Sequence, residues 1–302
     1  MVKGRFAPSP SGRMHLGNIY AALMSWLSVK KQNGSWILRI EDLDRQRCKP
    51  EYAQLLMDDL SWLGLEWDKL YFQSDRDNLY LDAFTQLCNK NLVYDCFCRR
   101  ADLLASSAPQ TPRDMQIYSG RCRTLTQQQR TQLSQERTPA QRIALPDKDI
   151  SFTDGHYGLQ TFNLLHDCGD FIVRRADKNF SYQLAVVVDD ALMDVTEIVR
   201  GRDLLNSTPQ QLFLYESLGY NAPQFSHIPL IVTQDGRRLS KREHDMNMGE
   251  LQKKYSATQI IGYVMYLCGF ISEPDSLSLS EALSLFDWEK IPQEDIILKT
   301  LP

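Results

Sequence analysis

Apolar and polar residues follow a regular spacing in the first part of the chain. Between residues 19 and 31, Ile19, Leu23, Trp26 and Leu27 fall on one helical face. This run follows a short apolar start and a loop rich in proline and glycine, so the pattern predicts a strand, an irregular loop and a helix. Such a helix presents backbone N–H groups at the carboxyl end of a strand, where open α/β sheets bind nucleotides, although the same loop can be a plain turn.

A second strand and two further helices are expected next. Residues 35–40 alternate between apolar and polar, which indicates a strand, and Glu41 follows its end. A carboxylate at this place can pair with a substrate ammonium group, and the alternative is a solvated acidic turn. Helical stripes follow in residues 50–63, with Pro50 in the first turn, and from residue 75 onward.

The composition changes at Tyr94, where a cysteine-containing segment begins. Cys96 and Cys98 precede a stretch rich in serine, alanine and proline, and Cys122 follows it. Three thiols in a short segment suit a compact tetrahedral Zn²⁺ site, because soft thiolate ligands favour zinc over harder cations. The alternative is three free cysteines without a metal.

The rest of the chain is predicted to complete an insertion and then to return to the first sheet. The expected elements are an exposed polar helix in residues 124–136, strands near 142–145, 150–153 and 170–174, a helix from Tyr182, a strand at 195–199, a helix at 209–218, a strand at 227–232, and two or three amphipathic helices after residue 248.

Composition places the chain among ordinary globular proteins. Of its 302 residues, 43% are hydrophobic and 24% are charged, and no apolar run approaches the length of a membrane span. The first residues lead directly into the loop described above, without a signal peptide, so we expect a cytoplasmic protein with no membrane partner. In that compartment the seven cysteines should be reduced thiols, with metal binding as their special use.

The net charge limits how RNA could be bound. A formal charge of −4 supplies no overall attraction to a polyanion, so any RNA contact depends on local basic patches. The candidates for phosphate contacts lie in the cysteine-containing segment and are Arg99, Arg100, Arg113, Arg121 and Arg123, against the alternative of solvated surface.

Several motifs together resemble one enzyme family. H-L-G-N at residues 15–18 and R-L-S-K-R at residues 238–242 resemble the HIGH and KMSKS signatures of class I aminoacyl-tRNA synthetases. The stretches that resemble the glutamyl subgroup are R-F-A-P-S-P-S-G at 5–12, L-R-I-E-D-L-D at 38–44, Y-Q-L-A-V-V-V-D-D-A at 182–191 and V-R-G-R-D-L-L at 199–205.

Only about sixty residues follow Arg242, which leaves room for one small subdomain and not for an anticodon-binding domain. This length resembles the short glutamyl paralogues, which attach glutamate to the queuosine base at the wobble position of tRNA(Asp). The resemblance implies an α/β, Rossmann-type catalytic domain in two halves, residues 1–93 and 178–247, with a zinc-containing insertion at 94–177 and a C-terminal helical subdomain at 248–302.

The same resemblance implies the site residues. His15 and Lys241 would be catalytic, and ATP, with Mg²⁺, would be bound by His15, Gly17, Asn18, Arg238, Ser240 and Lys241. L-glutamate would be bound by Arg5, Ala7, Ser9, Glu41, Tyr182 and Arg200. From the residues alone, Tyr182 could equally be a core aromatic and Arg200 a surface strand end.

A fourth metal ligand is also implied by the resemblance. The short paralogues have a Cys, Cys, Tyr, Cys arrangement for zinc, and Cys96, Cys98, Tyr118 and Cys122 match it. Without the resemblance, Tyr118 can be a packing residue.

Three functions are compatible with these features. The first is glutamylation of queuosine in the anticodon loop of tRNA(Asp) by a monomeric enzyme. The second is charging of a tRNA 3′ end, or of a carrier protein, by a shortened synthetase. The third is a regulator that binds glutamate or RNA without catalysis.

Overall fold

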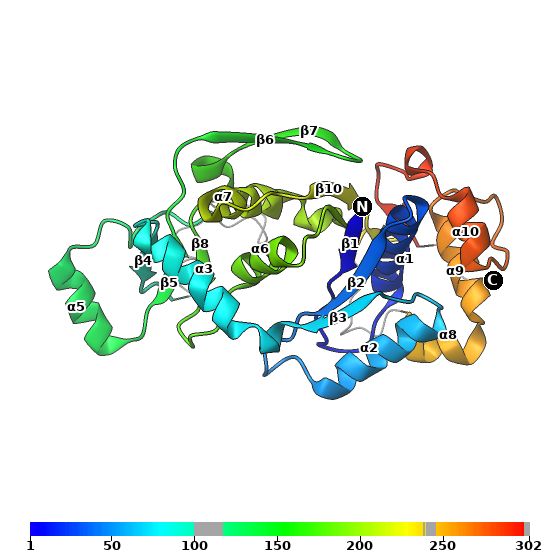
Figure 1. Cartoon of the computed structure of the whole chain (residues 1–302), viewed down its shortest axis with the longest axis horizontal. Coiled ribbons are helices and arrows are strands. Elements are labelled where there is room, and N and C mark those ends of the chain that lie inside the picture. The colour runs from blue at the N-terminus through cyan, green and yellow to red at the C-terminus, as the bar shows by residue number, and fades with distance from the viewer. Residues whose placement is uncertain (100–116, 238, 240–245, 299–302) are drawn as a thin grey trace.

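The structure, a computed structural model, describes residues 1–99, 117–237, 239 and 246–298. Its centre is a five-stranded parallel sheet with the strand order β10-β9-β1-β2-β3 (Figure 1). The strands are β1 (Lys3–Phe6), β2 (Ser35–Ile40), β3 (Lys69–Phe72), β9 (Glu197–Gly201) and β10 (Gln224–Ile228). The prediction of a Rossmann-type α/β fold is confirmed.

The strand order reverses direction at β1. The chain runs from β1 outward to β2 and β3 on one side, and β9 and β10 continue the sheet on the other side. Helix α1 (Leu16–Lys31) connects β1 to β2 and packs against β1, β2 and β9. A crevice forms at such a reversal, beyond the carboxyl ends of the strands, and it is the usual ligand site of open α/β sheets.

Helices cover both faces of the sheet (Figure 1). On strand β2, Trp36, Leu38 and Ile40 belong to one apolar core with α1 and α2 (Pro50–Trp62), whereas Ile37 belongs to a second core with α3 (Asp77–Asn89), α6 (Tyr182–Leu192) and α7 (Thr208–Leu218). Burial on both faces explains why β2 is mostly apolar. Arg39 lies on the Ile37 face of the strand, since side chains alternate along it.

The segment between the two halves of the sheet forms a separate three-stranded sheet and a hairpin. The elements are β4 (Val93–Cys96), α5 (Gln127–Glu136), β5 (Ala140–Ile143), β6 (Asp149–Asp154), β7 (Gly158–Asn163) and β8 (Phe171–Arg174). Strands β4, β5 and β8 pair in that order, and β6 pairs with β7. Strands β5, β6 and β8 lie near the predicted positions, while β3, β4 and β7 were not predicted. The domain boundaries stay a prediction.

One predicted strand is wrong. The pattern at residues 227–232 predicts a continuous strand, but β10 ends at Ile228 and the chain then leaves the central sheet. Pro229 has no N–H to donate to a ladder, so it favours a break at this point. Strand β11 (Ile231–Val232) pairs instead with β12 (Ile296–Ile297), close to the end of the described chain.

The C-terminal part is helical, as expected. Helices α8 (Met248–Lys254), α9 (Ala257–Leu267) and α10 (Leu279–Leu285) pack beside α1, and their buried residues join its core. Short helical turns complete the fold at η1 (Gln73–Asp75), η2 (Leu164–Cys168), η3 (Arg202–Ser207) and η5 (Trp288–Lys290). Throughout the described ranges, every helix is too short or too polar to cross a lipid bilayer.

Candidate active site

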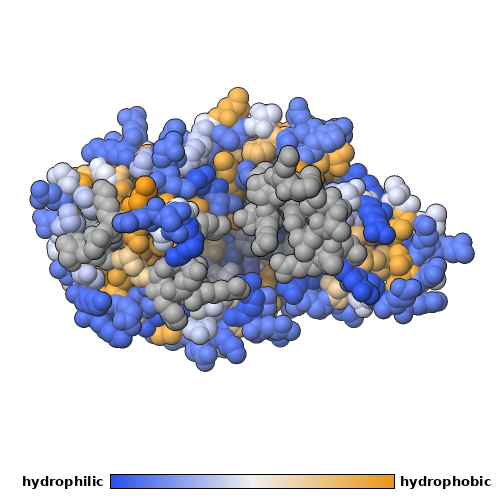
Figure 2. All heavy atoms as spheres, turned by 180° about the vertical axis from the view of Figure 1, so that it is seen from behind, coloured by the Kyte–Doolittle hydropathy of each residue, from blue (hydrophilic) through white to orange (hydrophobic). Residues whose placement is uncertain are grey.

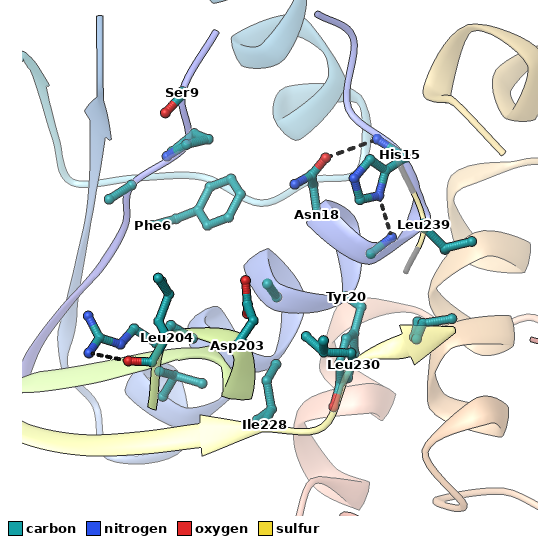
Figure 3. A pocket seen from close by; sticks show the side chains of 18 of the residues that line it. Phe6, Ser9, His15, Asn18, Tyr20, Asp203, Leu204, Ile228, Leu230 and Leu239 are labelled. Atoms are coloured by element: carbon teal, nitrogen blue, oxygen red, sulfur yellow. Dashed lines mark hydrogen bonds between the residues drawn. The ribbon is translucent and has the colours of Figure 1, made fainter. Parts of the chain in front are cut away.

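A cavity of about 490 Å³ opens at the carboxyl ends of β1, β2 and β9 (Figure 3). It is lined by all the described residues predicted to contact ATP or glutamate, namely Arg5, Ala7, Ser9, His15, Gly17, Asn18, Glu41, Tyr182 and Arg200. The other predicted ATP residues, Arg238, Ser240 and Lys241, lie outside the described residues, but Leu239 lines the cavity.

His15 is the N-cap of α1. Its Nδ1 accepts a hydrogen bond of 3.1 Å from the Gly17 N–H, and its own N–H donates to Asn18 Oδ1 at 3.1 Å, which completes a capping box (Figure 3). Because Nδ1 is an acceptor here, the proton of the neutral ring is on Nε2. The ring is thereby oriented beside the positive end of the helix, where anions bind favourably.

Gly17 leaves room for this arrangement. A Cβ at this position would lie 3.0 Å from His15 Cε1 and 3.1 Å from its Nδ1, tighter than ordinary contacts. The absence of a side chain lets the His15 ring fold over its own helix.

The segment after the KMSKS-like motif returns to His15. Leu16 donates its N–H to the Met246 carbonyl at 3.2 Å, and Met248 donates its N–H to the Met14 carbonyl at 2.9 Å. Residues 246–248 thus extend along residues 14–16, and Leu239, the described residue of the motif, lines the cavity near His15 (Figure 3). Leu239 and His15 therefore lie at one end of the cavity although they are more than two hundred positions apart in sequence.

A buried network of charges lies at the other end. Arg39, which is not exposed at all, donates to Asp190 at 2.5 Å and to Glu41 at 3.3 Å. Arg5, only 4% exposed, also donates to Asp190, through its Nε at 3.3 Å. This leaves the terminal nitrogens of Arg5 to the cavity, because no other Arg5 side-chain hydrogen bond occurs within the described ranges. Arg39 and Asp190 hold Arg5 and Glu41 in place.

Burial changes the proton affinities in this network. Burial raises the pKa of Glu41 to about 7, although the guanidinium groups of Arg39 and Arg5 oppose the change. Burial also acts to raise the pKa of Asp190, but Arg39 and Arg5 more than compensate, and its pKa lies below the ordinary value. Asp190 is therefore a permanent anion, whereas Glu41 can gain or lose a proton near neutral pH.

The pattern of charged residues in α6 was not interpreted from the sequence. Asp189 precedes Asp190 in an apolar helix, and it accepts hydrogen bonds from Gln73, Arg76 and Tyr80 at 2.6 to 2.8 Å. Two adjacent acids inside an apolar run were a usable signal, because buried carboxylates require partners. Their partners come from β1, β2, η1, α3 and the turn between η1 and α3, and could not be identified from sequence spacing.

Arg200 is buried, not a surface strand end. It is 5% exposed, and it donates from Nε to His227 Nε2 at 2.9 Å, from one terminal nitrogen to Gln211 at 2.8 Å, and from the other to Thr208 at 2.8 Å. Tyr182, at the start of α6, is partly buried against the second core and also lines the cavity. Both residues therefore line the same cavity as Glu41.

The three cysteines predicted to bind a metal do come together. The Sγ atoms of Cys96, Cys98 and Cys122 all lie within 4.8 Å of one another. The Tyr118 hydroxyl oxygen is 3.5 Å from Cys96 Sγ and 3.6 Å from Cys98 Sγ. Zinc–sulfur bonds of about 2.3 Å in a tetrahedron separate the sulfurs by about 3.8 Å, so the donor set fits Zn²⁺ in chemistry and size.

Arg142 is an additional residue of this cluster that sequence reasoning missed. Its guanidinium carbon lies 3.9 Å from the centre of the Tyr118 ring, and its Nε donates to Cys96 Sγ at 3.3 Å. A hydrogen bond of 2.7 Å to the Asp170 carbonyl fixes the guanidinium. The guanidinium stabilises negative charge on Cys96, and a thiolate is the form in which a cysteine binds a metal.

The predicted phosphate-binding arginines are in different situations. Arg123 donates to Asp170 Oδ1 at 2.6 Å and to the Leu145 carbonyl at 2.7 Å, so it braces the inserted sheet. Arg99 and Arg121 are exposed, whereas Arg100 and Arg113 lie outside the described residues. The face seen in Figure 2 is mostly hydrophilic, with apolar side chains scattered over it.

Comparison with known proteins gives consistent matches. The family model of the catalytic domain of class I tRNA synthetases (E and Q) matches residues 1–277. A glutamyl-Q tRNA(Asp) synthetase of Symbiobacterium thermophilum is 43% identical over 98% of this chain and 95% of its own length. The glutamate–tRNA ligase of Aquifex aeolicus is 36% identical over 96% of this chain, but this match covers 62% of the ligase. A crystal structure of a glutamate tRNA ligase from Elizabethkingia meningosepticum, in complex with its amino acid, has a TM-score of 0.82, 26% identity, and coverage of 99% of this chain and 67% of that one.

Proposed function

Because the chain belongs to the class I tRNA synthetases of the E and Q family, we propose that it activates L-glutamate with ATP and transfers the glutamyl group to queuosine at the wobble position of tRNA(Asp). The observation that carries the proposal is the division of the cavity into two ends. Arg5, Glu41 and Arg200 supply buried charges at one end, and His15 with the start of α1 supplies an anion site at the other. An amino acid with charges of both signs fits the first end, and the triphosphate of ATP fits the second end beside it.

Glutamate carries one ammonium and two carboxylate groups, and the charged end has a partner for each. Glu41 pairs with the ammonium group, and Arg5 and Arg200 pair with the carboxylates through charge-assisted hydrogen bonds. Tyr182 and Ser9 add neutral donors, and Ala7 leaves space beside them. A shorter acid such as aspartate cannot reach both arginines, so an N–H group of one arginine that faces the cavity would stay buried without an acceptor, which weakens the binding of aspartate.

The first reaction step needs positioning more than acid–base catalysis. An oxygen of the glutamate α-carboxylate attacks the α-phosphorus of ATP, a glutamyl-adenylate forms and pyrophosphate leaves. The attacking group is already an anion, so the enzyme holds the two reactants in line and stabilises charge on the phosphates. His15 and the N–H groups of the first α1 turn do this from one side. Lys241 lies outside the described residues; its ammonium group would stabilise the leaving pyrophosphate, and Mg²⁺, when bound, would supply further positive charge.

The second step requires access for the acceptor, and a neighbouring cavity supplies it. This cavity of about 330 Å³ shares Ser9, Ser11, Glu41 and Tyr182 with the first one, and Ser9, Glu41 and Tyr182 belong to the proposed glutamate site. An acceptor entering here reaches the glutamyl carbonyl without displacing the nucleotide. Arg47 and Arg175 also line it and suit the phosphates that flank a base splayed from a single-stranded loop.

The cysteine cluster is proposed to hold Zn²⁺ through Cys96, Cys98, Tyr118 and Cys122. The metal would serve structure and not the reaction, because the cluster lies in the inserted sheet and none of the four residues lines the cavity. In this position it joins the end of β4 to the segment at 118–122. We also propose that the enzyme acts as a monomer in the cytoplasm.

Charging of a tRNA 3′ end is the second candidate. It is favoured by the similarity to glutamate–tRNA ligases in sequence and fold. The first candidate is preferred because the glutamyl-Q relative combines the higher identity with coverage of 95% of its own length.

The test is ATP-dependent retention of labelled glutamate on tRNA from cells able and unable to make queuosine. Label confined to the queuosine-containing pool, and recovered in the anticodon fragment after nuclease digestion, is the expected result. Equal labelling of both pools, with label on the terminal adenosine, would establish 3′-end charging instead. Protein carrying Lys241→Ala serves as the control for non-enzymatic attachment.

A further inference from the structure

His227 lies directly behind the arginine proposed to bind a carboxylate of glutamate. It belongs to β10, is fully buried, and its Nε2 is 2.9 Å from Arg200 Nε. An arginine Nε always carries a hydrogen, so His227 Nε2 must be the acceptor of this hydrogen bond. The ring of Phe225 lies under both groups, 6.3 Å from the imidazole and 5.1 Å from the guanidinium carbon, and restricts their movement.

The other nitrogen of His227 contacts an acid from the insertion. Asp154, the last residue of β6, is 2% exposed, and its Oδ2 is 2.5 Å from His227 Nδ1. The other oxygen, Oδ1, accepts from the backbone N–H groups of His156, Tyr157 and His227 at 2.9 to 3.2 Å. The hairpin turn therefore fixes the orientation of the carboxylate.

The hairpin is held tightly against β10. Gly155 donates its N–H to the Phe225 carbonyl at 2.8 Å, and a Cβ on Gly155 would lie 2.2 Å from Ser226 Oγ. A side chain here would force the Ser226 hydroxyl to move, so glycine favours this approach, which places Asp154 within reach of the imidazole. A segment of the insertion thus forms part of the wall behind the catalytic crevice.

We propose that Asp154 and His227 are positioning residues for glutamate binding: Asp154 holds His227 in the tautomer with the proton on Nδ1, so that Nε2 accepts from Arg200 and aims its guanidinium at a substrate carboxylate. The proposal rests on the proposed function, in which Arg200 binds glutamate. Neither residue contacts the substrate. They act through the direction in which Arg200 presents its remaining N–H group, since hydrogen bonds to His227, Gln211, Thr208 and the Leu204 carbonyl use the other four.

The ionisation of the pair is consistent with this arrangement. Burial lowers the pKa of His227, although Asp154 opposes the change. Burial acts to raise the pKa of Asp154, but the hydrogen bonds from His227 and from the Tyr157 backbone prevail, and its pKa is below the ordinary value. The pair is thus a carboxylate and a neutral ring, as the tautomer argument requires.

Asp154→Asn is the most informative substitution, because it changes the tautomer and little else. The three backbone N–H groups around Oδ1 require the amide oxygen at that position, so the amide NH₂ takes the place of Oδ2 and faces His227 Nδ1. An N–H donor facing Nδ1 favours the tautomer with the ring proton on Nε2. The Nε2–H of His227 and the Nε–H of Arg200 are then two donors that face each other and cannot form a hydrogen bond. We expect the Michaelis constant for glutamate to rise about tenfold while that for ATP changes less than about twofold.

A second pair of variants separates the two nitrogens of His227. Glutamine at this position places its Oε1 near Nε2 and can accept from Arg200, whereas asparagine reaches only to the Nδ1 position. We expect His227→Gln to keep the Michaelis constant for glutamate within about threefold and His227→Asn to raise it about tenfold or more. Both variants lose the ring, so the difference between them reports the acceptor and not packing.

The kinetic measurement is glutamate-dependent exchange of pyrophosphate into ATP, with and without tRNA. The matched control is Thr161→Ala, which removes an exposed side-chain hydrogen bond on β7 of the same hairpin and should leave both Michaelis constants unchanged. Equal Michaelis constants for the His227→Gln and His227→Asn proteins, or an unchanged constant after Asp154→Asn, would overturn the inference. Absence of exchange in the natural protein would overturn the proposed function instead.

The tautomer can be observed independently of activity. In protein labelled with ¹⁵N-histidine, long-range proton–nitrogen spectra distinguish Nδ1–H from Nε2–H, and His227→Gln assigns the signal. The Nδ1–H form in the natural protein and the Nε2–H form after Asp154→Asn are expected. An Nε2–H form in the natural protein would contradict the proposal, whether or not the enzyme activates glutamate.

Discussion

Arg39 donates a 2.5 Å hydrogen bond to Asp190, and neither side chain is more than 1% exposed. The same guanidinium also lies 3.3 Å from Glu41 and 3.6 Å from Asp189, so a single cation from β2 balances three carboxylates beneath the cavity. Such a group is costly to bury, but once buried it cannot be removed without depriving Asp190 and Glu41 of their nearest cation.

Replacement of this cation is therefore predicted to be severely destabilising. Arg39→Met leaves Asp190 and Glu41 without their main partner, and we expect the free energy of unfolding to fall by about 3–5 kcal/mol in urea denaturation. The matched control is Lys30→Met, which breaks the partly exposed Lys30–Asp68 pair at 3.2 Å. Its expected cost is below about 1 kcal/mol. Similar costs for the two variants would show that the buried network does not contribute as described.

Glutamate binding is predicted to weaken in mild acid. Glu41 has its pKa raised by burial to about 7, and only its carboxylate form attracts the substrate ammonium group. As the pH falls below about 7, the protonated fraction grows, so the Michaelis constant for glutamate should rise, approaching tenfold per pH unit well below the pKa. The Michaelis constant for glutamate is measured from the exchange of pyrophosphate into ATP between about pH 5.5 and 8.5. In the Glu41→Gln protein the constant should be high and nearly independent of pH, and the same dependence in both proteins would contradict the assignment.

Metal binding is predicted to require the cysteine cluster. Cys122→Ser removes one of three thiolates whose Sγ atoms lie within 4.8 Å, and the zinc content of purified protein should fall well below one equivalent. Tyr118→Phe should retain zinc with weaker affinity, as measured by competition with a chelator. Cys88→Ser is the control, because Cys88 is a half-buried cysteine outside the cluster. Full zinc content after Cys122→Ser would exclude that ligand.

Loss of Lys241 is predicted to slow the chemical step. If its ammonium group stabilises the leaving pyrophosphate, Lys241→Ala should lower the rate of adenylate formation by about 10²-fold or more, while the Michaelis constant for glutamate changes less than about threefold. Rapid-quench measurement of adenylate formation tests this prediction. Lys253→Ala serves as a control, since Lys253 is an exposed residue paired with Glu250. A normal rate of adenylate formation without Lys241 would contradict this role of the residue.

Much of the catalytic framework could be predicted from local patterns. The helix after the first loop, the strand that leads to Glu41 and the helix that begins at Pro50 depend on periodicity, capping and proline chemistry within a few residues. The continuous strand at 227–232 was wrong for a similar reason. An apolar run reports burial, but burial in two different sheets produces the same pattern, and only pairing distinguishes them.

The linear sequence by itself determined which chemical groups are present and in what order: the motifs with His15, Glu41 and Arg200, and three thiols close enough in the chain to share a metal. It could do so because these features are short and local. The tertiary structure alone decided that Arg39 balances Asp190, that Arg142 stacks on Tyr118, and that Asp154 of the insertion reaches His227. These contacts join residues 24 to 151 positions apart, and their partners are selected by the packing of whole elements, which spacing along the chain does not encode.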